Sequence, residues 1–343
     1  MPKVSVVVLN WNGKKFLKNC LDSLLKLTFS QVEIIVVDNN STDGSQEFIK
    51  KNYKKVILIE NKENYGFAKG NNIGFKTSTG EYILILNNDT IVTPNFLEPL
   101  IRDFENDPKI ACLQPQIRLL ENKQLLDGVG AFLTPTGILY HFGYLKNRMQ
   151  LEYNKKMKIF SAKGACILLR RKAAEKVGLF DEDFFIFFEE TDFCYRLWLA
   201  GYSVMYEPKS VIYHLGGGDT TSSNSYKQVK RKYMSFRNML CCYLKNFGTR
   251  NLLLILPVCI FLQVCLAFYY LITLKIKLMI AVFKAFLWNM VNIEETLKKR
   301  SIVQHKMRVI SDAKLNKEIF RNPGLDYYLY ILMGDFRYYK DKF

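Results

Sequence analysis

The sequence predicts an α/β protein with a doubly wound, mostly parallel sheet, followed by a helical region that associates with a membrane. Two observations lead to this prediction. In the first half of the chain, apolar runs of strand length alternate with segments of helical spacing, which is typical of a parallel sheet covered by helices. In the last third, a long uncharged stretch lies within a strongly basic region.

The alternation begins with the run VSVVVLN at Val4. This run is too short and too rich in β-branched residues for the apolar core of a signal peptide, so we expect a strand and no signal peptide. Similar runs are VEIIVVD, VILIE and YILILN, and the segments between them have helical character. We therefore expect strands at 4–9, 32–38, 56–60 and 82–87, with helices at 13–27, 45–53 and 67–78.

The rest of this domain has shorter signals. We expect a strand in KGACILLRR, and a helix that begins near Glu190 and ends at Gly201. Two further strands, in YSVMYEP and SVIYHLGGG, would end the domain near Gly218.

The charge of the chain is uneven. The net charge is +17, and the residues from Ser225 onward contain 21 Lys/Arg but only 7 Asp/Glu. A basic region suits an anionic partner, either a nucleic acid or a membrane surface. We predict four regions: an α/β domain at 1–220, a basic linker helix at 221–250, apolar helices at 251–293 and a basic tail at 294–343.

The apolar region favours a membrane. Residues 251–274 carry no charge, and this stretch is about as long as the roughly 20 residues that span a bilayer. Pro257 and Gln263 weaken the case for a span, and a buried helix of a soluble core is the alternative. Three lysines at 275–284 lie on an apolar background, as in a helix at a membrane interface. Because the uncharged stretch interrupts the basic region, we favour lipid over nucleic acid, with spanning and interfacial arrangements both open.

Several common site motifs are absent from the sequence. The eight cysteines include no CxxC pair, so we expect reduced cysteines that pack in the interior, as in a cytosolic protein. No GxGxxG follows the first strand and no GxxxxGK[ST] occurs. These absences disfavour a dinucleotide-binding fold and exclude a P-loop.

Polar side chains follow the expected strands, at the edge where parallel sheets bind ligands. Asp38 comes directly after IIVV, where a turn needs no acid, and its carboxylate could accept hydrogen bonds from a nucleobase or ribose. Asp89 ends the segment LNNDT, where a carboxylate beside two amides could hold a divalent cation. Thr93 and Pro94 can start the next helix by themselves. Asp89 is therefore not needed for that helix start and has no evident structural role.

A cluster of acids follows the aromatic run FFIFF. Glu189, Glu190 and Asp192 would suit the N-terminus of a helix. The apolar flank, however, places at least one carboxylate against apolar walls, which is how a carboxylate is tuned to act as a general base. His214, one of three histidines, is either a core or turn residue or a metal ligand.

Together these segments resemble a known family. The resemblance rests on seven motifs in order: VSVVVLNWN, VVDNNSTDGS, NYGFAKGNNIG, LILNNDT, KGACILLRR, FDEDFFIFFEETDFCYRL and YHLGGG. They resemble the family 2 glycosyltransferases of the GT-A fold, especially the rhamnosyltransferase-like members that build bacterial surface polysaccharides. The resemblance covers about residues 3–220.

The resemblance implies roles for particular residues. The implied nucleotide-binding residues are Asn10, Asn12, Asp38, Asn64, Gly66, Asn71 and Asn88. Gly164 and Ala165 match the loop beneath the donor sugar. Asp89 and His214 would hold Mg²⁺ or Mn²⁺ on the diphosphate.

Two departures from the family pattern affect these roles. Asn87 stands where the family has the first acid of its Asp-X-Asp motif, so one carboxylate is missing from the metal site. Glu190 stands where the family usually has an Asp as the base. The candidates for the base are therefore Glu190, Glu189 and Asp192.

The resemblance implies an inverting glycosyltransferase. Its donor would be a nucleoside-diphosphate sugar, with dTDP-rhamnose or a UDP-hexose as candidates, and its acceptor a hydroxyl of a lipid-linked or polysaccharide glycan. An anionic membrane surface would be a partner, at the cytoplasmic face of the cell membrane, and nucleic acid would not. One alternative is a membrane-bound scaffold with a degenerate site, which Asn87 favours. The other is a sugar nucleotidyltransferase, which would need a glycine-rich basic loop where this chain has only Gly13.

Overall fold

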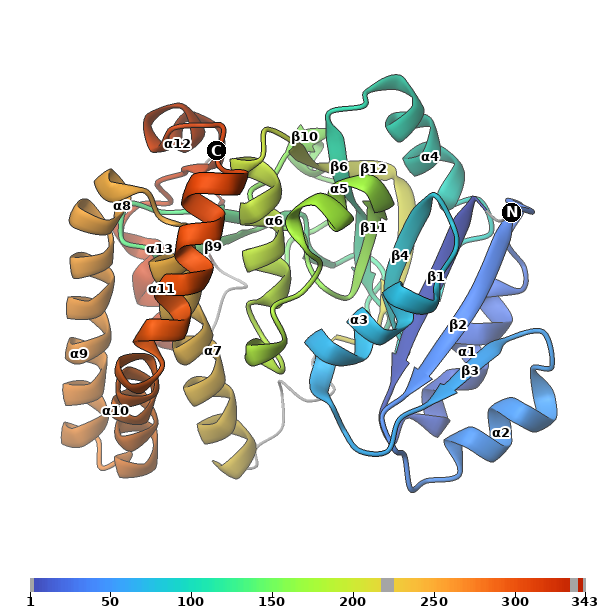
Figure 1. The fold of residues 1–343 in the computed structure, drawn as a ribbon, viewed down its shortest axis with the longest axis horizontal. Helices are drawn as coiled ribbons and strands as arrows, with labels where there is room; N and C mark the ends of the chain where they lie inside the picture. Colours follow the sequence, from blue (N-terminus) through green and yellow to red (C-terminus); the bar gives the residue numbers. More distant parts are fainter. Residues whose placement is uncertain (1–2, 217–224, 334–338, 342–343) are drawn as a thin grey trace.

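The computed structural model describes residues 3–216, 225–333 and 339–341 (Figure 1). Within these residues, an α/β part holds one large sheet and a small two-stranded sheet, and a layer of helices lies beside it. The predicted boundary near 220 lies outside the described residues.

The large sheet has the strand order β10-β12-β6-β11-β4-β1-β2-β3, with β5 paired to β12 and β7 paired to β6. Its centre is parallel, because β1 pairs with β2 and β4 in the same direction and β2 does so with β3. β11 is antiparallel to β4 and β6, and β8 pairs with β9 in the small sheet. The strands are β1 (Val4–Asn10), β2 (Val32–Asp38), β3 (Ile57–Glu60), β4 (Tyr82–Asn87), β5 (Thr90–Val92), β6 (Ile110–Leu119), β7 (Leu126–Gly128), β8 (Gly130–Leu133), β9 (Leu139–Phe142), β10 (Met157–Lys158), β11 (Cys166–Arg170) and β12 (Ser203–His214).

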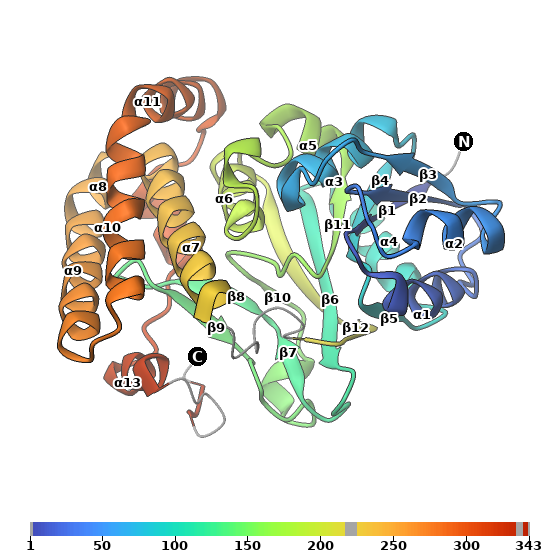
Figure 2. The same ribbon diagram turned by 90° about the horizontal axis from the view of Figure 1, so that it is seen from below.

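Helices cover both faces of this sheet (Figure 2). In β1, Val6 and Val8 belong to the apolar core on one face and Val7 to the core on the other, as expected for a strand buried on both sides. The first core includes α1 (Lys14–Leu24), α2 (Ser45–Asn52) and α4 (Leu97–Asn106), and the second includes α3 (Gly66–Thr77), α5 (Arg171–Val177) and α6 (Glu189–Leu199). The predicted α/β class with a mostly parallel central sheet is confirmed.

The C-terminal helices continue the second core. Apolar side chains of α6, α7, α9, α10, α12 and α13 belong to one buried cluster. α7 contacts α6 on one side and α10 on the other, and α10 contacts α9. The helices are α7 (Ser225–Asn246), α8 (Thr249–Leu254), α9 (Leu256–Ile272), α10 (Ile276–Val291), α11 (Ile293–Ile302), α12 (Asp312–Ile319) and α13 (Leu325–Met333).

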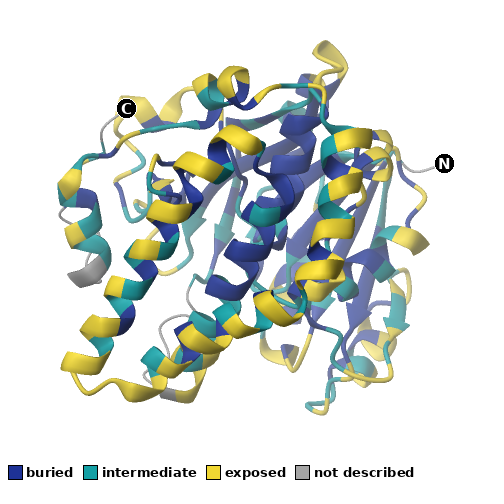
Figure 3. Cartoon of the chain, turned by 60° about the vertical axis from the view of Figure 1, so that its left-hand side comes forward, coloured by how far each residue is buried: buried dark blue, intermediate teal, exposed yellow. Residues whose placement is uncertain are grey.

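One C-terminal helical stretch is long and apolar enough to cross a bilayer, judged by length and composition among the described residues. This stretch is Thr249–Ile272, with 24 residues and a mean hydropathy of 2.6. The outer surface of these helices is exposed, whereas α6 is buried along its length (Figure 3). All eight cysteines lie within the described residues and are free, and seven of them are buried, as predicted.

Two local predictions were wrong. Thr93 does not cap a helix, because its backbone N–H and its hydroxyl both donate to the Val211 carbonyl, at 3.3 and 2.8 Å, and α4 begins only at Leu97. The two strands expected at 202–218 form the single strand β12, with an irregularity between Glu207 and Val211.

Candidate active site

The candidate site lies at the carboxyl ends of β1, β2 and β4, where the strand order changes direction, which is where open α/β sheets bind ligands. Three side chains join these ends. Asn10 Nδ2 donates to Asp38 Oδ2 at 2.8 Å, and Asn88 Nδ2 donates to Asn10 Oδ1 at 2.7 Å. Gly13 leaves room for this contact, because a Cβ at that position would lie only 2.1 Å from Asn88 Nδ2 and would collide with it.

Asp38 is fully buried and highly bonded. Its carboxylate accepts from Ser41 N at 2.8 Å, Ser41 Oγ at 2.6 Å, Gln46 Nε2 at 2.7 Å and Asn10 Nδ2 at 2.8 Å. A carboxylate has about four acceptor positions. In this conformation Asp38 therefore organises the turn after β2 and leaves no acceptor open to a nucleobase.

The open edge beside Asp38 is formed by the turn after β1. Asn12 has a positive φ of 49° and is exposed; its N–H donates to Ser41 Oγ at 2.8 Å, and its Oδ1 accepts from Thr42 N at 2.8 Å. Trp11, between Asn10 and Asn12 in the chain, is 54% exposed. The sequence analysis gave Trp11 no role, although an aromatic residue directly after a buried strand can indicate a binding surface at the strand end.

The predicted second nucleotide loop lies at the start of α3. Asn64 Oδ1 accepts from Gly66 N at 2.9 Å and from Asn39 Nδ2 at 3.3 Å. Asn71 is fully buried, and its Nδ2 donates to the Phe67 carbonyl at 2.9 Å. Asn71 Oδ1 is buried without a hydrogen-bond partner, so it is an available acceptor.

The predicted donor-sugar loop lies between this region and the acids. The Ala165 carbonyl accepts from Asn87 N at 3.0 Å, which extends the pairing of β11 with β4. A Cβ built on Gly164 would lie 3.5 Å from the Phe67 ring and 3.9 Å from Glu190 Cβ. The fold thus brings the Gly164 loop, the start of α3 and the start of α6 into contact.

Glu189 and Glu190 are the first two residues of α6. Glu189 is buried, and its Oε2 has no hydrogen-bond partner. Burial, with a smaller effect of Glu190, raises the pKa of Glu189 well above its usual value. Glu190 is half-buried, and burial raises the pKa of its carboxyl too. Both carboxyls have surroundings suited to proton transfer.

Asp192 has different surroundings. It is fully buried and accepts from Arg196 Nε at 2.9 Å and Asn246 Nδ2 at 2.7 Å, and it pairs with Lys245 Nζ at 2.9 Å. Burial raises the pKa of Asp192, but Lys245 and Arg196 outweigh this effect and hold the pKa below its usual value. The carboxylate of Asp192 is therefore occupied in ion pairs between α6 and α7, which argues against its role as the base.

Asp89 and His214 come together because β5 pairs with β12, which places His214 opposite Thr90. Asp89 Oδ1 lies 3.2 Å from His214 Nε2. His214 Nδ1 lies 2.6 Å from Asp127 Oδ2, and Asp127 Oδ1 pairs with Lys163 Nζ at 2.6 Å. Burial lowers the pKa of His214, but the Asp127 and Asp89 carboxylates outweigh burial and raise it to about 9.

Asp89 and His214 offer a carboxylate oxygen and an imidazole nitrogen to the Mg²⁺ or Mn²⁺ that the resemblance implies. Among the described residues, no group of three or more His, Cys, Asp or Glu is arranged to hold a metal ion. Asp89 Oδ1, however, is buried and accepts no hydrogen bond of normal geometry. Mg²⁺ commonly takes one or two carboxylates plus substrate phosphates. With Nδ1 held by Asp127, the His214 Nε2 atom can be the ligand, as in carboxylate–histidine–metal arrangements.

Sequence reasoning missed Asp127 and Lys163. Asp127 lies in the short strand β7, 87 residues from His214 in the chain. Lys163 directly precedes Gly164, and its charge acts on Glu190 in the direction that lowers the pKa of that carboxyl. Lys163 is therefore ion-paired with the Asp127 that holds His214, and its charge also acts on the acid at the start of α6.

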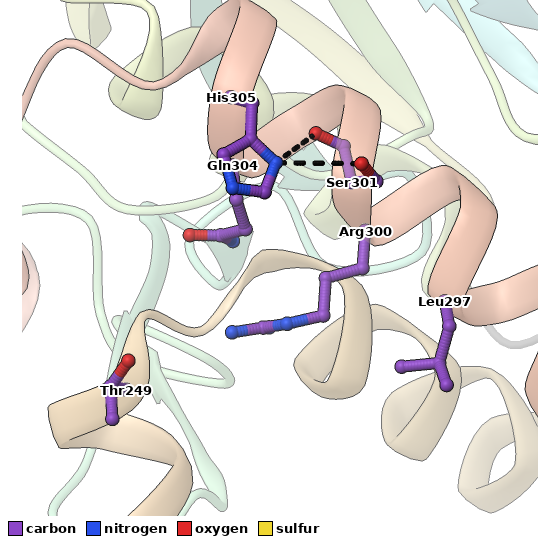
Figure 4. A pocket seen from close by; sticks show the side chains of 6 residues that line it. All are labelled: Thr249, Leu297, Arg300, Ser301, Gln304 and His305. Atoms are coloured by element: carbon purple, nitrogen blue, oxygen red, sulfur yellow. Dashed lines mark hydrogen bonds between the residues drawn. The ribbon is translucent and has the colours of Figure 1, made fainter.

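A separate depression lies among the C-terminal helices (Figure 4). Its lining shares no residue with the strand-end site and consists of Thr249, Leu297, Arg300, Ser301, Gln304 and His305. Arg300 Nη1 donates to the Leu244 carbonyl at 2.7 Å, so this side chain holds α11 against the end of α7.

Several known proteins are similar to this chain in sequence. The chain is 25% identical over 253 residues to an uncharacterized glycosyltransferase of Haemophilus influenzae, covering 72% of this chain and 76% of the relative. It is 26% identical over 207 residues to poly-beta-1,6-N-acetyl-D-glucosamine synthase of Staphylococcus aureus, covering 60% of this chain and 48% of the relative. The chain thus spans about half the length of the Staphylococcus aureus enzyme.

Solved structures share the fold. GalNAc-T7, crystallised with UDP, GalNAc and Mn²⁺, superposes with a TM-score of 0.56 at 19% identity, over 71% of this chain and 48% of that one. The mannosyltransferase PcManGT of Pyrobaculum calidifontis, in complex with GDP-Man and Mn²⁺, superposes with a TM-score of 0.53 at 15% identity. The match covers 89% of this chain and 81% of that one. The sequence model described as Glycosyl transferase family 2 matches residues 5–178, from β1 to the end of α5. With half of its length matched, this chain belongs to glycosyl transferase family 2.

Proposed function

We propose that this protein is an inverting glycosyltransferase that moves a sugar from a nucleoside diphosphate to a hydroxyl of a lipid-linked or polysaccharide acceptor. The observation that carries the proposal is the contact of three parts at the strand ends. Gly164 adjoins both Phe67 and Glu190, while Lys163 before it connects to the pair formed by Asp127 and His214. A donor sugar beside Gly164 would lie between an acid and a cation site.

The proposed reaction is a single displacement with Glu190 as the base. The Glu190 carboxylate takes the proton of the acceptor hydroxyl, and that oxygen forms a bond to the anomeric carbon. The bond from the anomeric carbon to the diphosphate oxygen breaks on the opposite side, and the nucleoside diphosphate leaves with the electron pair. Glu190 suits this role better than Asp192, whose carboxylate is bonded to Arg196 and Lys245.

The remaining site residues would hold the donor. Asp89 Oδ1 and His214 Nε2 would hold Mg²⁺ or Mn²⁺, which offsets the charge of the leaving diphosphate. Asn71 Oδ1, buried and without a partner, could accept a hydrogen bond from the nucleotide. Trp11 could stack on the base.

We propose the donor only as a class, the nucleoside-diphosphate sugars, and not as one particular sugar. The resemblance favours dTDP-rhamnose, whereas the Staphylococcus aureus relative is a poly-N-acetylglucosamine synthase and PcManGT binds GDP-Man. We therefore propose a panel of dTDP-rhamnose, UDP-GlcNAc, UDP-glucose and GDP-mannose.

We further propose that the hairpin of α9 and α10 docks on the cytoplasmic face of an anionic membrane. The outer face of α9 exposes Phe261, Phe268 and Ile272, at 65%, 58% and 80%, and Leu274 in the connecting turn is 83% exposed. The chain has no acid between Asn251 and Ile293 but has three lysines there, and each lysine near an anionic surface adds about 1 kcal/mol to binding.

Docking on one leaflet suits the hairpin better than crossing the bilayer. The stretch Thr249–Ile272 is long and apolar enough to cross a bilayer by itself, but α10 is poorly suited to the return crossing. Lys284 is exposed in the middle of α10, where a crossing hairpin would carry it into the hydrocarbon. The turn between α9 and α10 lies at the same edge of the molecule as the end of β1 (Figure 1), so a docked protein would turn its site towards a lipid-linked acceptor.

A donor panel tests the function. Each nucleotide sugar is incubated with the protein, Mn²⁺ and a bacterial lipid extract, and nucleoside diphosphate release is measured against Glu190→Gln. Release that depends on Glu190 supports the proposal, and absence of release with every donor supports a scaffold. Pyrophosphate release from nucleoside triphosphate and sugar 1-phosphate would instead indicate a nucleotidyltransferase.

A further inference from the structure

The loop that connects η2, a short 3₁₀ helix (Glu182–Phe184), to α6 has an unusual backbone. Phe185, Phe187 and Phe188 have φ values of 58°, 72° and 73°. Bulky side chains rarely adopt this left-handed region, and three cases within four residues need strong support from their surroundings.

That support comes from α7. Asn238 Nδ2 donates to the carbonyls of Phe184 at 2.8 Å, Ile186 at 3.0 Å and Phe187 at 2.7 Å. Arg237 Nη2 donates to the carbonyls of Asp183 and Phe184 at 2.6 and 3.1 Å, and Arg237 Nε donates to Asn238 Oδ1 at 2.8 Å. Both α7 side chains are buried, Asn238 at 1% and Arg237 at 7% exposure.

The other side of the loop contacts the candidate site. The Phe185 carbonyl accepts from the N–H groups of Phe67 and Ala68, at 2.6 and 3.2 Å, at the start of α3. The Phe185 ring fills the space at Gly66, where a Cβ would lie 2.5 Å from it. Phe188 is the residue before α6, so the position of the loop also sets the direction in which Glu190 projects.

The opposite face of α7 contacts the docking hairpin. Asn289 Nδ2 on α10 donates to the Arg237 carbonyl at 3.0 Å, and Arg237 Cζ lies 4.6 Å from the centre of the Trp288 ring. Arg237 and Asn238 therefore lie between the inner side of α10 and the loop that precedes the acids of α6.

We infer that Asn238, supported by Arg237, is a positioning residue that holds the strained 184–188 loop and thereby places both Glu190 and the Gly66 turn. This inference rests on the proposed function only where it treats Glu190 as the base. The Asn238 amide is suited to this task, because its two N–H bonds are shared among three carbonyls of the loop.

Asn238→Asp is the sharpest test, because it keeps the size of the side chain and the acceptor for Arg237 but removes both N–H donors. Hydrogen–deuterium exchange of the peptide that holds Phe67 and Ala68 reports release of the loop directly. We expect exchange at Phe67 and Ala68 to rise at least about tenfold, because the loop loses three hydrogen bonds and the loss of even one allows a several-fold rise. Asn238→Ser, which keeps one donor, should give an intermediate rise and provides a second variant if Asn238→Asp folds poorly.

Turnover provides the second readout. We expect kcat for nucleoside diphosphate release to fall about a hundredfold, as misplacement of a catalytic group by an ångström can cause. The acidic limb of the pH profile should move towards the usual Glu value as Glu190 becomes more exposed. Asn316→Asp is the matched control, because it removes an amide donor to Asn251, at 2.9 Å, in the same helical region but away from the loop.

The outcomes separate the two proposals. If Asn238→Asp matches Asn316→Asp in exchange at Phe67 and Ala68, the inference is wrong, whatever its effect on melting temperature. If exchange rises but kcat is unchanged in an active enzyme, the positioning role is also wrong. If exchange rises and the wild-type protein acts on no donor, the loop support stands and the proposed function fails.

Discussion

Replacing Lys245 with Met would remove the buried cation that connects α7 to two other segments. The Lys245 side chain is 3% exposed, and its Nζ pairs with Asp181 at 2.6 Å and Asp192 at 2.9 Å. Asp181 precedes η2 and Asp192 lies in α6, so one ammonium group joins three elements beside the candidate site. Methionine has a similar length and fills the same space, so the main change is the loss of charge.

The expected cost follows from the two carboxylates left behind. Removing one partner of a buried ion pair typically destabilises a protein by about 3–5 kcal/mol. Each acid here keeps one cation, because Lys299 still pairs with Asp181 and Arg196 still pairs with Asp192. We therefore expect a loss near the lower limit, about 3 kcal/mol in the free energy of unfolding.

The loss should depend on pH. Burial raises the pKa of Asp181, but Lys245 and Lys299 outweigh it and hold the pKa well below its usual value. The stabilisation from a carboxyl with a lowered pKa is complete above its unfolded value, about 3.9, and is lost as the pH falls through the folded value. The difference between wild type and Lys245→Met should therefore be full at pH 7 and shrink below about pH 4.

Urea unfolding followed by circular dichroism measures this difference, with Lys298→Met as the control. Lys298 pairs with Glu294 and Glu295 on α11, but its side chain is 62% exposed. Exposed pairs of this kind contribute little, so the control should lie within about 0.5 kcal/mol of wild type. Equal stability of the two variants at pH 7 would refute the reasoning, as would a loss that does not change with pH.

Four further predictions concern turnover, metal binding and membrane binding. Glu190→Gln should lower nucleoside diphosphate release by about a hundredfold or more without lowering the melting temperature. Because burial raises the pKa of Glu190 and only its ionised form accepts a proton, wild-type turnover should fall with decreasing pH through a midpoint above the usual Glu value. Asp89→Ala should weaken Mn²⁺ binding measured by electron paramagnetic resonance, whereas Asn87→Asp should preserve or tighten it. Glu substitutions at Phe268 and Ile272 should release the protein from phosphatidylglycerol vesicles in a flotation assay.

For these predictions, the following results would contradict the reasoning. Asp192→Asn should cost stability rather than turnover per folded molecule, and the reverse pattern would make it the base in place of Glu190. Undiminished Mn²⁺ binding by Asp89→Ala would move the cation site elsewhere. The Lys314→Gln and Lys317→Gln pair on α12 changes the net charge as much as the hairpin pair does. Equal release by both pairs would mean that charge alone, and not the apolar face, holds the protein on vesicles.

The sequence predicted those parts of the site that lie within single segments. The buried strand before Asp38 and the polar end of the strand before Asp89 were visible as an abrupt change from apolar to polar residues. The contact between Asn88 and Asn10 follows from parallel neighbours whose carboxyl ends meet. Local patterns are sufficient there because a strand's direction and neighbours determine where its end lies.

The sequence did not reveal contacts between distant segments. Asp127 lies in a three-residue strand with no periodic signal, and only the fold brings it to His214. We expected a basic linker helix at 221–250 that suits an anionic partner, yet Arg237 and Lys245 are buried and bonded. Lys232, in the same helix, is mostly covered and lies 3.4 Å from Gln263 Oε1, and burial lowers its pKa to about 8. Average charge does not distinguish a cation on the surface from one within a buried network.

These buried contacts change how the membrane role can be tested. Deleting the chain beyond Asn246 would remove α9 and α10, but it would also expose the inner side of α7, where Asn289 bonds to Arg237. A truncated protein could then leave the membrane because it lost its docking face, or lose activity because the loop before Glu190 was released. The outer face of the hairpin contacts none of these groups, since Phe268 and Ile272 project away from the buried side of α9. Substitutions on the outer face should therefore reduce vesicle binding and transfer to a lipid-linked acceptor while the reaction with a soluble acceptor continues, and only they separate docking from chemistry.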